Sequence, residues 1–323
     1  MKRTAFLALI LFLGCQPQRQ NPYLMSGDGF VDVEGGQIWY GIMGEGDQAP
    51  FVYLHGGPGG TSRAGLNLLD LSKDRPVILM DQLGSGLSTY HEDSTLLTVR
   101  HFVEQVKALK EALNLQEFYL TGGSWGTALA LEYYMAYPDG IKGIVFNSPY
   151  FSTSTWIADT DTLISTLPDS VQRAIAIAEA THSFETESYL AAMDVFSDHF
   201  IFRIPNEERQ KPSLGIFDVS YDTMSSRNSF IYNYMWGPSE FSPTGTLLSY
   251  ENVDALSRIT VPVLFTTGEF DEARPATVKG FASMVPNAKY LEIPNAGHVT
   301  MAHNADMIVE ALRSFANRVD EER

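Results

Sequence analysis

A serine, an aspartate and a histidine in this chain could together carry out nucleophilic catalysis. Ser124 lies in the run Gly122-Gly123-Ser124-Trp125-Gly126, which fits the G-x-S-x-G pattern of serine nucleophiles. A serine hydroxyl is a poor nucleophile at neutral pH, so it needs an adjacent base. His298 is the candidate base, because it follows the last expected strand and Gly297 allows a tight loop there, whereas the other six histidines lie in less suitable segments. The residues therefore predict a serine hydrolase.

The acidic partner of His298 is expected on the loop Gly268-Glu269-Phe270-Asp271-Glu272, where three carboxylates compete. We select Asp271, since the chain order serine, acid, histidine and a Gly-x-x-Asp loop after a strand fit the fold in which such nucleophiles occur. Its carboxylate would fix the tautomer of His298 and stabilise the imidazolium. An ordinary imidazole titrates at about 6 to 7, and we expect that range for His298 in the free enzyme.

Attack on a carbonyl also needs two backbone N–H groups that face the developing negative oxygen. One is expected from Trp125, the residue after the nucleophile. The other is expected from the loop His55-Gly56-Gly57-Pro58-Gly59, with Gly57 as the preferred donor. We interpret His55 as a structural hydrogen-bonding residue rather than a catalytic one.

The elements that must position these residues alternate between strands and helices. Strands are expected at residues 50–54, 75–81, 117–121, 143–146, 261–267 and 289–293, and the first two contain continuous apolar runs typical of strands covered on both faces. Helical patterns lie at residues 96–115, 127–137 and about 305–318, and a further one follows the strand at 261–267 and ends at about residue 284. Ser124 thus lies between a strand and a helix, as a nucleophile elbow requires. We predict an α/β-hydrolase fold with a mostly parallel, doubly wound sheet.

The alternation stops between about residues 150 and 250, where the chain is helical in pattern and rich in aromatic residues. We predict a helical cap there, inserted between the two parts of the core, residues 30–149 and 251–323. The first 14 residues are predicted to be a signal peptide, and residues 15–29 a polar linker.

The N-terminal segment resembles a bacterial lipoprotein signal. Lys2 and Arg3 precede an apolar run that is too short to span a bilayer and ends at Cys15, the only cysteine. The resemblance implies lipidation of Cys15 and a membrane-anchored protein of the bacterial cell envelope, facing the periplasm or the exterior. An ordinary signal peptide and a buried helix are the alternatives.

The overall charge limits the possible partners. The formal net charge of −17 argues against a nucleic-acid partner, which needs a basic patch. We find no spacing of His, Cys or Glu typical of a metal site, so neither a metal nor another cofactor is expected. The oligomeric state is left open.

Together, four segments resemble the prolyl aminopeptidase, or proline iminopeptidase, family of α/β hydrolases. They are residues 55–59, 81–88, 122–126 and the pair of loops that hold residues 268–272 and 297–298. Leu83 is a departure, because the family often has arginine there. The segment at residues 232–241 is most like that of the archaeal tricorn-interacting aminopeptidase.

On this resemblance, Glu240 and Glu272 would bind the N-terminal ammonium of a short peptide or aminoacyl amide. The implied activity is that of a serine aminopeptidase that releases N-terminal residues, proline among them, through an acyl-enzyme. An esterase or amino-acid amidase on the same scaffold is the alternative within the enzyme class. A lipoprotein that binds peptides without turnover is the alternative from another class.

Overall fold

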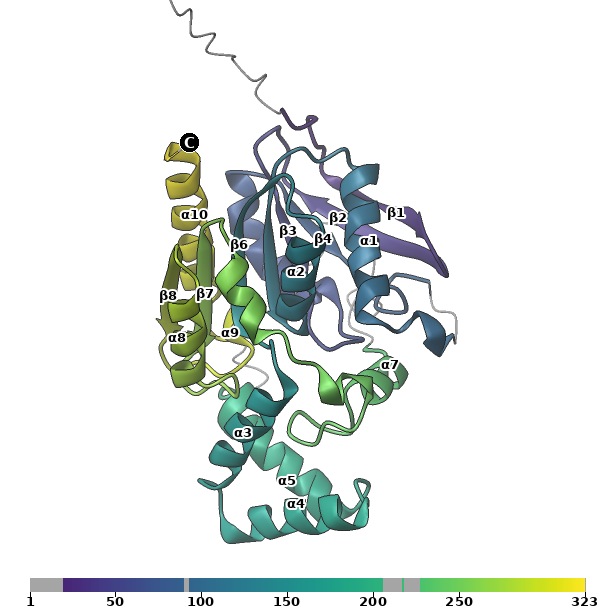
Figure 1. Ribbon diagram of the computed structural model, residues 1–323, viewed down its shortest axis with the longest axis vertical. Coiled ribbons are helices and arrows are strands. Elements are labelled where there is room, and N and C mark those ends of the chain that lie inside the picture. Colours follow the sequence, from purple (N-terminus) through teal and green to yellow (C-terminus); the bar gives the residue numbers. More distant parts are fainter. Residues whose placement is uncertain (1–19, 90–92, 206–216, 218–226, 323) are drawn as a thin grey trace, which may run out of the picture.

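One eight-stranded sheet forms the centre of the computed structural model, which describes residues 20–89, 93–205, 217 and 227–322 (Figure 1). The strand order is β1-β2-β4-β3-β5-β6-β7-β8. β2 is antiparallel to both β1 and β4, and all other neighbouring strands are parallel. The strands are β1 (Gly27–Val33), β2 (Gly36–Met43), β3 (Phe51–Leu54), β4 (Val77–Met80), β5 (Phe118–Ser124), β6 (Ile141–Pro149), β7 (Val263–Gly268) and β8 (Ala288–Ile293). The predicted mostly parallel α/β sheet is therefore confirmed.

Helices cover both faces of the sheet. One face is covered by α1 (Val99–Ala112), α2 (Trp125–Ala136), α8 (Pro275–Met284) and the 3-10 helix η5 (Val253–Arg258). The other face is covered by the 3-10 helix η1 (Ser62–Lys73), α9 (Thr300–His303) and α10 (Ala305–Glu321), which share a second apolar cluster with the sheet. Every residue of the central strands β3, β4 and β6 is buried, because both of their faces are covered.

The chain leaves the sheet after β6 and returns to it at β7. Before η5, which packs on the sheet, the helices described between them are α3 (Thr153–Ile164), α4 (Asp169–Thr181), α5 (Glu187–Phe196), the π-helix η3 (Ser197–Ile201), α7 (Ser229–Met235) and the 3-10 helix η4 (Thr246–Ser249). They lie beyond the carboxyl ends of the parallel strands, with α3, α4 and α5 at the bottom of the view in Figure 1 and α7 above them at the right. We call these helices the cap.

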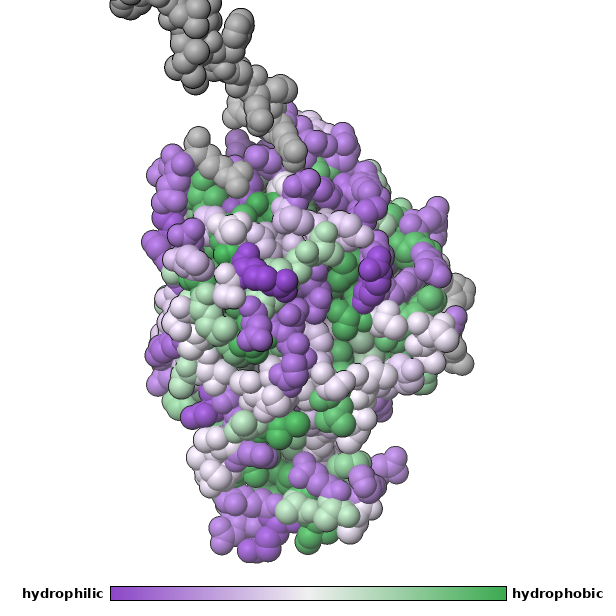
Figure 2. All heavy atoms as spheres, viewed as in Figure 1, coloured by the Kyte–Doolittle hydropathy of each residue, from purple (hydrophilic) through white to green (hydrophobic). Residues whose placement is uncertain are grey.

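The outer part of the cap has its own small core. Buried apolar side chains of α4 and α5, among them Tyr189 and Phe196, pack with Phe241. Some apolar side chains also show on its surface among polar ones (Figure 2), and Ile177 and Leu190 are exposed there.

The expected elements are present with small shifts at their ends. The helix after the nucleophile begins at Trp125 rather than at residue 127, because Ser124 alone makes the turn from strand to helix. The helix expected at residues 96–115 spans 99–112, and the side chain of Thr98 caps its N-terminus. The predicted signal peptide and Cys15 lie outside the described residues. No described helix is both long and apolar enough to cross a bilayer.

Candidate active site

Ser124 occupies a strained turn between β5 and α2. Its φ of 53° and ψ of −126° are unusual for a residue with a side chain. The flanking glycines make this turn possible, because a Cβ on Gly122 would collide with the carbonyl of Gly126, and one on Gly126 with the carbonyl of Leu54. The turn presents Ser124 to a cavity beneath the cap.

Asp271 lies on the loop after β7 and is held by many donors. Its Oδ2 accepts hydrogen bonds from the Ser148 hydroxyl at 2.6 Å, the Thr267 hydroxyl at 2.9 Å and the Gly268 N–H at 3.1 Å. Its Oδ1 accepts from the Ala273 N–H at 2.9 Å and lies 2.8 Å from Nδ1 of His298. Burial opposes ionisation, but the charge of His298 and these hydrogen bonds outweigh it and lower the pKa of Asp271.

His298 lies on the loop after β8, and the cap holds its backbone. The His298 N–H donates to the carbonyl of Phe200 in the π-helix at 2.8 Å. Because Asp271 is ionised, Nδ1 of the imidazole carries the proton between them.

The proton affinity of His298 differs from the sequence-based expectation of about 6 to 7. Burial lowers its pKa, but the charges of Asp271, Glu272 and Glu240 raise it to about 9. The sequence contained the three carboxylates, yet it could not show that all of them face one imidazole.

In the described chain, no hydrogen bond joins Ser124 to His298. Nε2 of His298 lies instead 3.7 Å from Oε1 of Glu272. Catalytic hydrogen bonds often become short and well aligned only in the complex with substrate, so this arrangement is compatible with the expected serine–histidine pair.

The expected oxyanion donors, Gly57 and Trp125, line the same cavity as Ser124. Trp125 is the first residue of α2, where backbone N–H groups have no acceptor within the helix. Its indole N–H donates at 2.9 Å to Gln82, and the amide group of Gln82 donates at 3.0 Å to the carbonyl of His55. The loop that contains Gly57 is thus fastened to the helix that contains Trp125.

His55 has the structural role expected from the sequence. Its Nε2 accepts a hydrogen bond from the Gln82 N–H at 3.0 Å, so its Nδ1 carries the proton and donates to Gly56 O at 2.8 Å. Burial lowers the pKa of His55 and outweighs the opposing charge of Asp81, which keeps the ring neutral.

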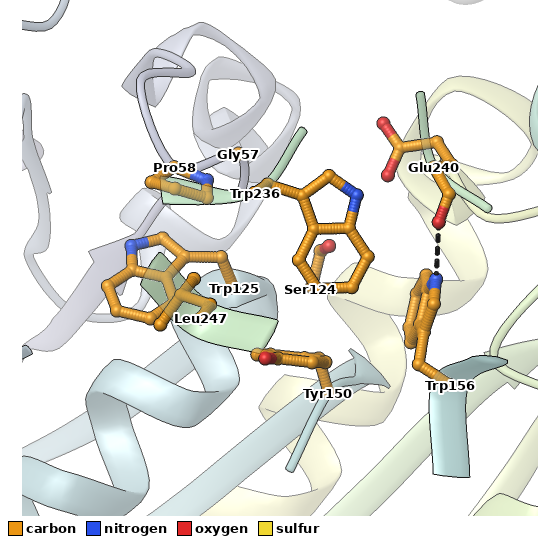
Figure 3. A pocket seen from close by; sticks show the side chains of 9 residues that line it. All are labelled: Gly57, Pro58, Ser124, Trp125, Tyr150, Trp156, Trp236, Glu240 and Leu247. Carbon is orange, nitrogen blue, oxygen red and sulfur yellow. Dashed lines mark hydrogen bonds between the residues drawn. The ribbon is translucent and has the colours of Figure 1, made fainter. Parts of the chain in front are cut away.

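The cavity opens to solvent, its empty space including that opening is about 230 Å³, and its walls are mostly apolar. Figure 3 shows Ser124 between the rings of Tyr150, Trp156 and Trp236, with Glu240 at one side. The Trp156 ring also packs edge-on against His298, with 5.6 Å between ring centroids. The residues that line the cavity are Gly57, Pro58, Ser124, Trp125, Tyr150, Trp156, Trp236, Glu240 and Leu247.

Glu240 reaches this region from the cap, and Glu272 from the loop after β7. The backbone carbonyl of Glu240 accepts a hydrogen bond from the Trp156 indole at 2.8 Å, which anchors the residue beside the cavity (Figure 3). Its carboxylate lies 3.9 Å from the guanidinium of Arg227. Glu272 is completely buried, and neither of its carboxylate oxygens has a hydrogen-bond partner among the described residues. Burial raises the pKa of Glu272, and the charges of Glu240 and Asp271 add to that rise.

The sequence of this chain matches known α/β hydrolases over most of its length. The family model described as alpha/beta hydrolase fold matches residues 49–305. A proline iminopeptidase from Heyndrickxia coagulans is 38% identical over 296 residues, which cover 90% of this chain and 99% of that protein. The chain belongs to the proline iminopeptidase family of α/β hydrolases. It is therefore an enzyme of the serine peptidase type, and the alternative of a binding protein without turnover finds no support.

Solved structures agree with this family. The structure of VinJ has a TM-score of 0.79 and 31% sequence identity, and the match covers 91% of this chain and 99% of that one. A proline iminopeptidase from Mycobacterium smegmatis has a TM-score of 0.79 and 27% identity, with 92% and 99% of the two chains covered.

Several side chains that support this iminopeptidase-type site were missed in the sequence. Ser148 at the end of β6 donates to Asp271, and Gln82 links the two oxyanion loops. Tyr232 is buried near Glu240, and the guanidinium of Arg227 stacks on its ring at 3.6 Å. The position of Ser148 at the carboxyl end of a buried strand was a usable signal, because polar residues at the carboxyl ends of parallel strands meet at one edge.

A metal site is absent from the part of the chain that the structure describes. No group of three or more His, Cys, Asp or Glu side chains there is arranged to hold an ion.

Proposed function

We propose that this enzyme is a serine aminopeptidase that releases N-terminal proline, among other residues, from short peptides or aminoacyl amides. The observation that carries the proposal is Glu272. A completely buried carboxylate without hydrogen bonds is costly, and a bound cation would supply both the missing charge and the missing donors. The ammonium of a free peptide N-terminus is such a cation. The names of the relatives point to the same substrate.

Glu240 would complete the ammonium site from the cap side. An ammonium between two carboxylates recovers more of its lost hydration than it would beside one. The ion pair of Glu240 with Arg227 is partly exposed, so exchanging that partner for an ammonium costs little.

The cavity walls fit a small ring next to the ammonium. Tyr150, Trp156 and Trp236 offer aromatic surfaces around Ser124, and a pyrrolidine ring would bury its methylenes against them. Aromatic faces also attract a nearby cation. These walls favour proline at the N-terminus of the substrate.

The proposed reaction uses the three residues expected from the sequence. Ser124 attacks the first carbonyl of the substrate while His298 accepts its proton, and Asp271 stabilises the resulting imidazolium. The N–H groups of Gly57 and Trp125 stabilise the oxyanion. His298 then protonates the leaving amine, and water hydrolyses the acyl-enzyme, which frees the N-terminal residue and restores Ser124.

The proposal is tested with a panel of aminoacyl-naphthylamides, each paired with its N-acetylated form. We expect rapid release of naphthylamine from the free-amine proline substrate and little from the acetylated one. Ser124→Ala should reduce turnover by a factor on the order of 10⁴ or more while the protein stays folded. Equal activity on both forms would favour the alternative of an esterase or amidase that does not recognise an amine.

We also propose that the enzyme is anchored in the bacterial cell envelope through lipid on Cys15. The N-terminal sequence supports this location, and two or more acyl chains suffice for stable anchoring. Membrane fractionation and the intact mass of wild type and Cys15→Ser provide the test. Soluble wild-type protein without lipid would contradict it.

A further inference from the structure

Glu272 lies between the proposed base and the proposed ammonium site. Its Oε1 is 3.7 Å from Nε2 of His298, the nitrogen that must accept the proton of Ser124. No hydrogen bond within the described chain occupies that nitrogen, and Ser124 does not bond to it. The carboxylate is thus the nearest charged partner of the reactive nitrogen.

The charges around His298 favour the imidazolium. Asp271 and Glu272 face the ring from the loop after β7, and Glu240 contributes from the cap. Together these carboxylates overcome the effect of burial and raise the pKa of His298 to about 9. Burial raises the pKa of Glu272 as well, so the two groups share one proton, but the charge of the imidazolium 3.7 Å away opposes that rise and favours the ion pair. An imidazolium has no lone pair at Nε2, so it cannot take a proton from Ser124. The other charged or titratable groups that act on Glu272 are Arg227 and Tyr232.

We propose that Glu272 makes the protonation state of His298 dependent on the substrate. In the free enzyme the carboxylate of Glu272 stabilises the imidazolium. When the substrate ammonium binds Glu272 instead, His298 loses its proton and can act as the base. This inference rests on the proposed aminopeptidase function, because it assigns the ammonium to the same carboxylate. Amine recognition then activates the catalytic base, in addition to holding the substrate.

The charges balance in this exchange. The bound ammonium brings one positive charge to Glu272, and His298 loses one proton from Nε2 to water. The net charge of the group is unchanged, and the lone pair at Nε2 becomes available to the Ser124 hydroxyl. A neutral ester brings no cation, so at neutral pH it binds to an enzyme whose His298 is largely protonated.

The first experiment measures kcat/KM against pH on a neutral acetate ester for wild type and Glu272→Gln. Loss of the negative charge lowers the pKa of His298, so the rising limb should move to lower pH in the variant. Each unit of this shift raises the rate about tenfold at a pH well below both pKa values. Glu269→Gln is the matched control, because Glu269 is an exposed carboxylate on the same loop and glutamine keeps an oxygen that can accept the hydrogen bond from the Asn295 N–H. Its profile should coincide with that of wild type.

The second experiment uses the unmodified enzyme, and it stands even where Glu272→Gln fails to fold. A small neutral fluorophosphonate labels Ser124 with loss of fluoride, and this step needs the base but no later deacylation. Methylammonium chloride should accelerate labelling of wild type at pH 7 relative to sodium chloride at equal ionic strength. Glu272→Gln should label quickly in both salts.

The outcomes separate this inference from the proposed function. An ester profile that stays in place in folded Glu272→Gln, or wild-type labelling that methylammonium leaves unchanged or slows, would overturn the coupling. If the enzyme releases naphthylamine from free-amine substrates but fails the ester or labelling test, the proposed function stands and only the coupling is wrong. An enzyme that cleaves no free-amine substrate fails the proposed function, whatever its labelling behaviour.

Discussion

Asp271 and Glu272 are adjacent in the chain and equally buried, with 1% and 0% of their surface exposed, but their environments are opposite. Asp271 accepts hydrogen bonds from Ser148, Thr267, Gly268, Ala273 and His298. Glu272 accepts none from the described residues. The pKa of Asp271 is accordingly lowered and that of Glu272 is raised. One loop thus supplies an ionised carboxylate that orients the base and a second carboxylate that has no hydrogen bond from the described residues.

Glu240→Gln should separate amine recognition from the chemistry at Ser124. Removing one carboxylate from a desolvated ammonium typically costs about 2–5 kcal/mol, so kcat/KM on a free-amine prolyl naphthylamide should fall roughly 30-fold to several thousand-fold. Hydrolysis of a neutral acetate ester should not fall, since Ser124 and the oxyanion donors are untouched and loss of the Glu240 charge lowers the pKa of His298. Equal losses on both substrates would indicate a folding defect and would remove the argument for an amine site.

The pH dependence should differ between the two substrate classes. His298 must be neutral to act as a base, so kcat/KM on a neutral ester should rise with pH through about 9. A peptide must also keep its ammonium, whose pKa is roughly 8, so its kcat/KM should rise and then fall again. A fall at the same pH on both substrates would assign it to an enzyme group instead.

Ser148 should position Asp271, because its hydroxyl lies 2.6 Å from Oδ2 and 3.0 Å from the carbonyl of His298. Without this donor the carboxylate binds the imidazolium more strongly, so the rising limb of the ester pH profile should move to higher pH. We also expect a loss of roughly tenfold in kcat.

Two variants of Ser148 distinguish the hydroxyl from the backbone. Ser148 has a φ of 49°, which glycine adopts without strain, so Ser148→Gly and Ser148→Ala should differ in stability but share the pH shift. Ser85→Ala is the control, because Ser85 is equally buried and its hydroxyl has no partner among the described residues. If the ester pH profile stays in place in both Ser148 variants, the role of Ser148 is structural only.

The sequence was sufficient for the fold because the strands are short apolar runs with polar or glycine-rich loops at their ends. The residues chosen for catalysis all follow such runs, and parallel strands bring their carboxyl ends to one edge of the sheet. Asp271 and His298 therefore meet although 27 positions separate them. The same rule places Gly57, after β3, beside Ser124, at the end of β5.

The electrostatics of the site could not be obtained in this way. Ser148 and Asp271 are 123 positions apart, and their hydrogen bond depends on the backbone at the end of β6. The raised pKa of His298 depends on the burial of Glu272 and on the fold of the cap around Glu240. Sequence spacing identifies which loops approach one another. The proton affinity of His298, however, depends on differences of about an ångström in the distances between its ring and the carboxylates on those loops.

Gly297→Ala should show that the cap holds the catalytic base. A Cβ at this position would lie 2.7 Å from the carbonyl oxygens of both Phe200 and Ile201, so the loop of His298 must shift away from the π-helix. That shift also disturbs the hydrogen bond from the His298 N–H to Phe200. A displacement of about 1 Å at a catalytic group can cost on the order of 100-fold in rate, and the loss should affect the prolyl amide and the neutral ester alike. This common loss contrasts with the substrate-dependent loss expected for Glu240→Gln.

Gly280→Ala is the control, because its Cβ would meet no atom within 4 Å, and alanine is the better helix former in α8. It should keep full activity with a melting temperature equal to or above that of wild type. Gly297→Ala with wild-type rates on both substrates would show that the base tolerates movement of its loop and does not depend on contact with the cap.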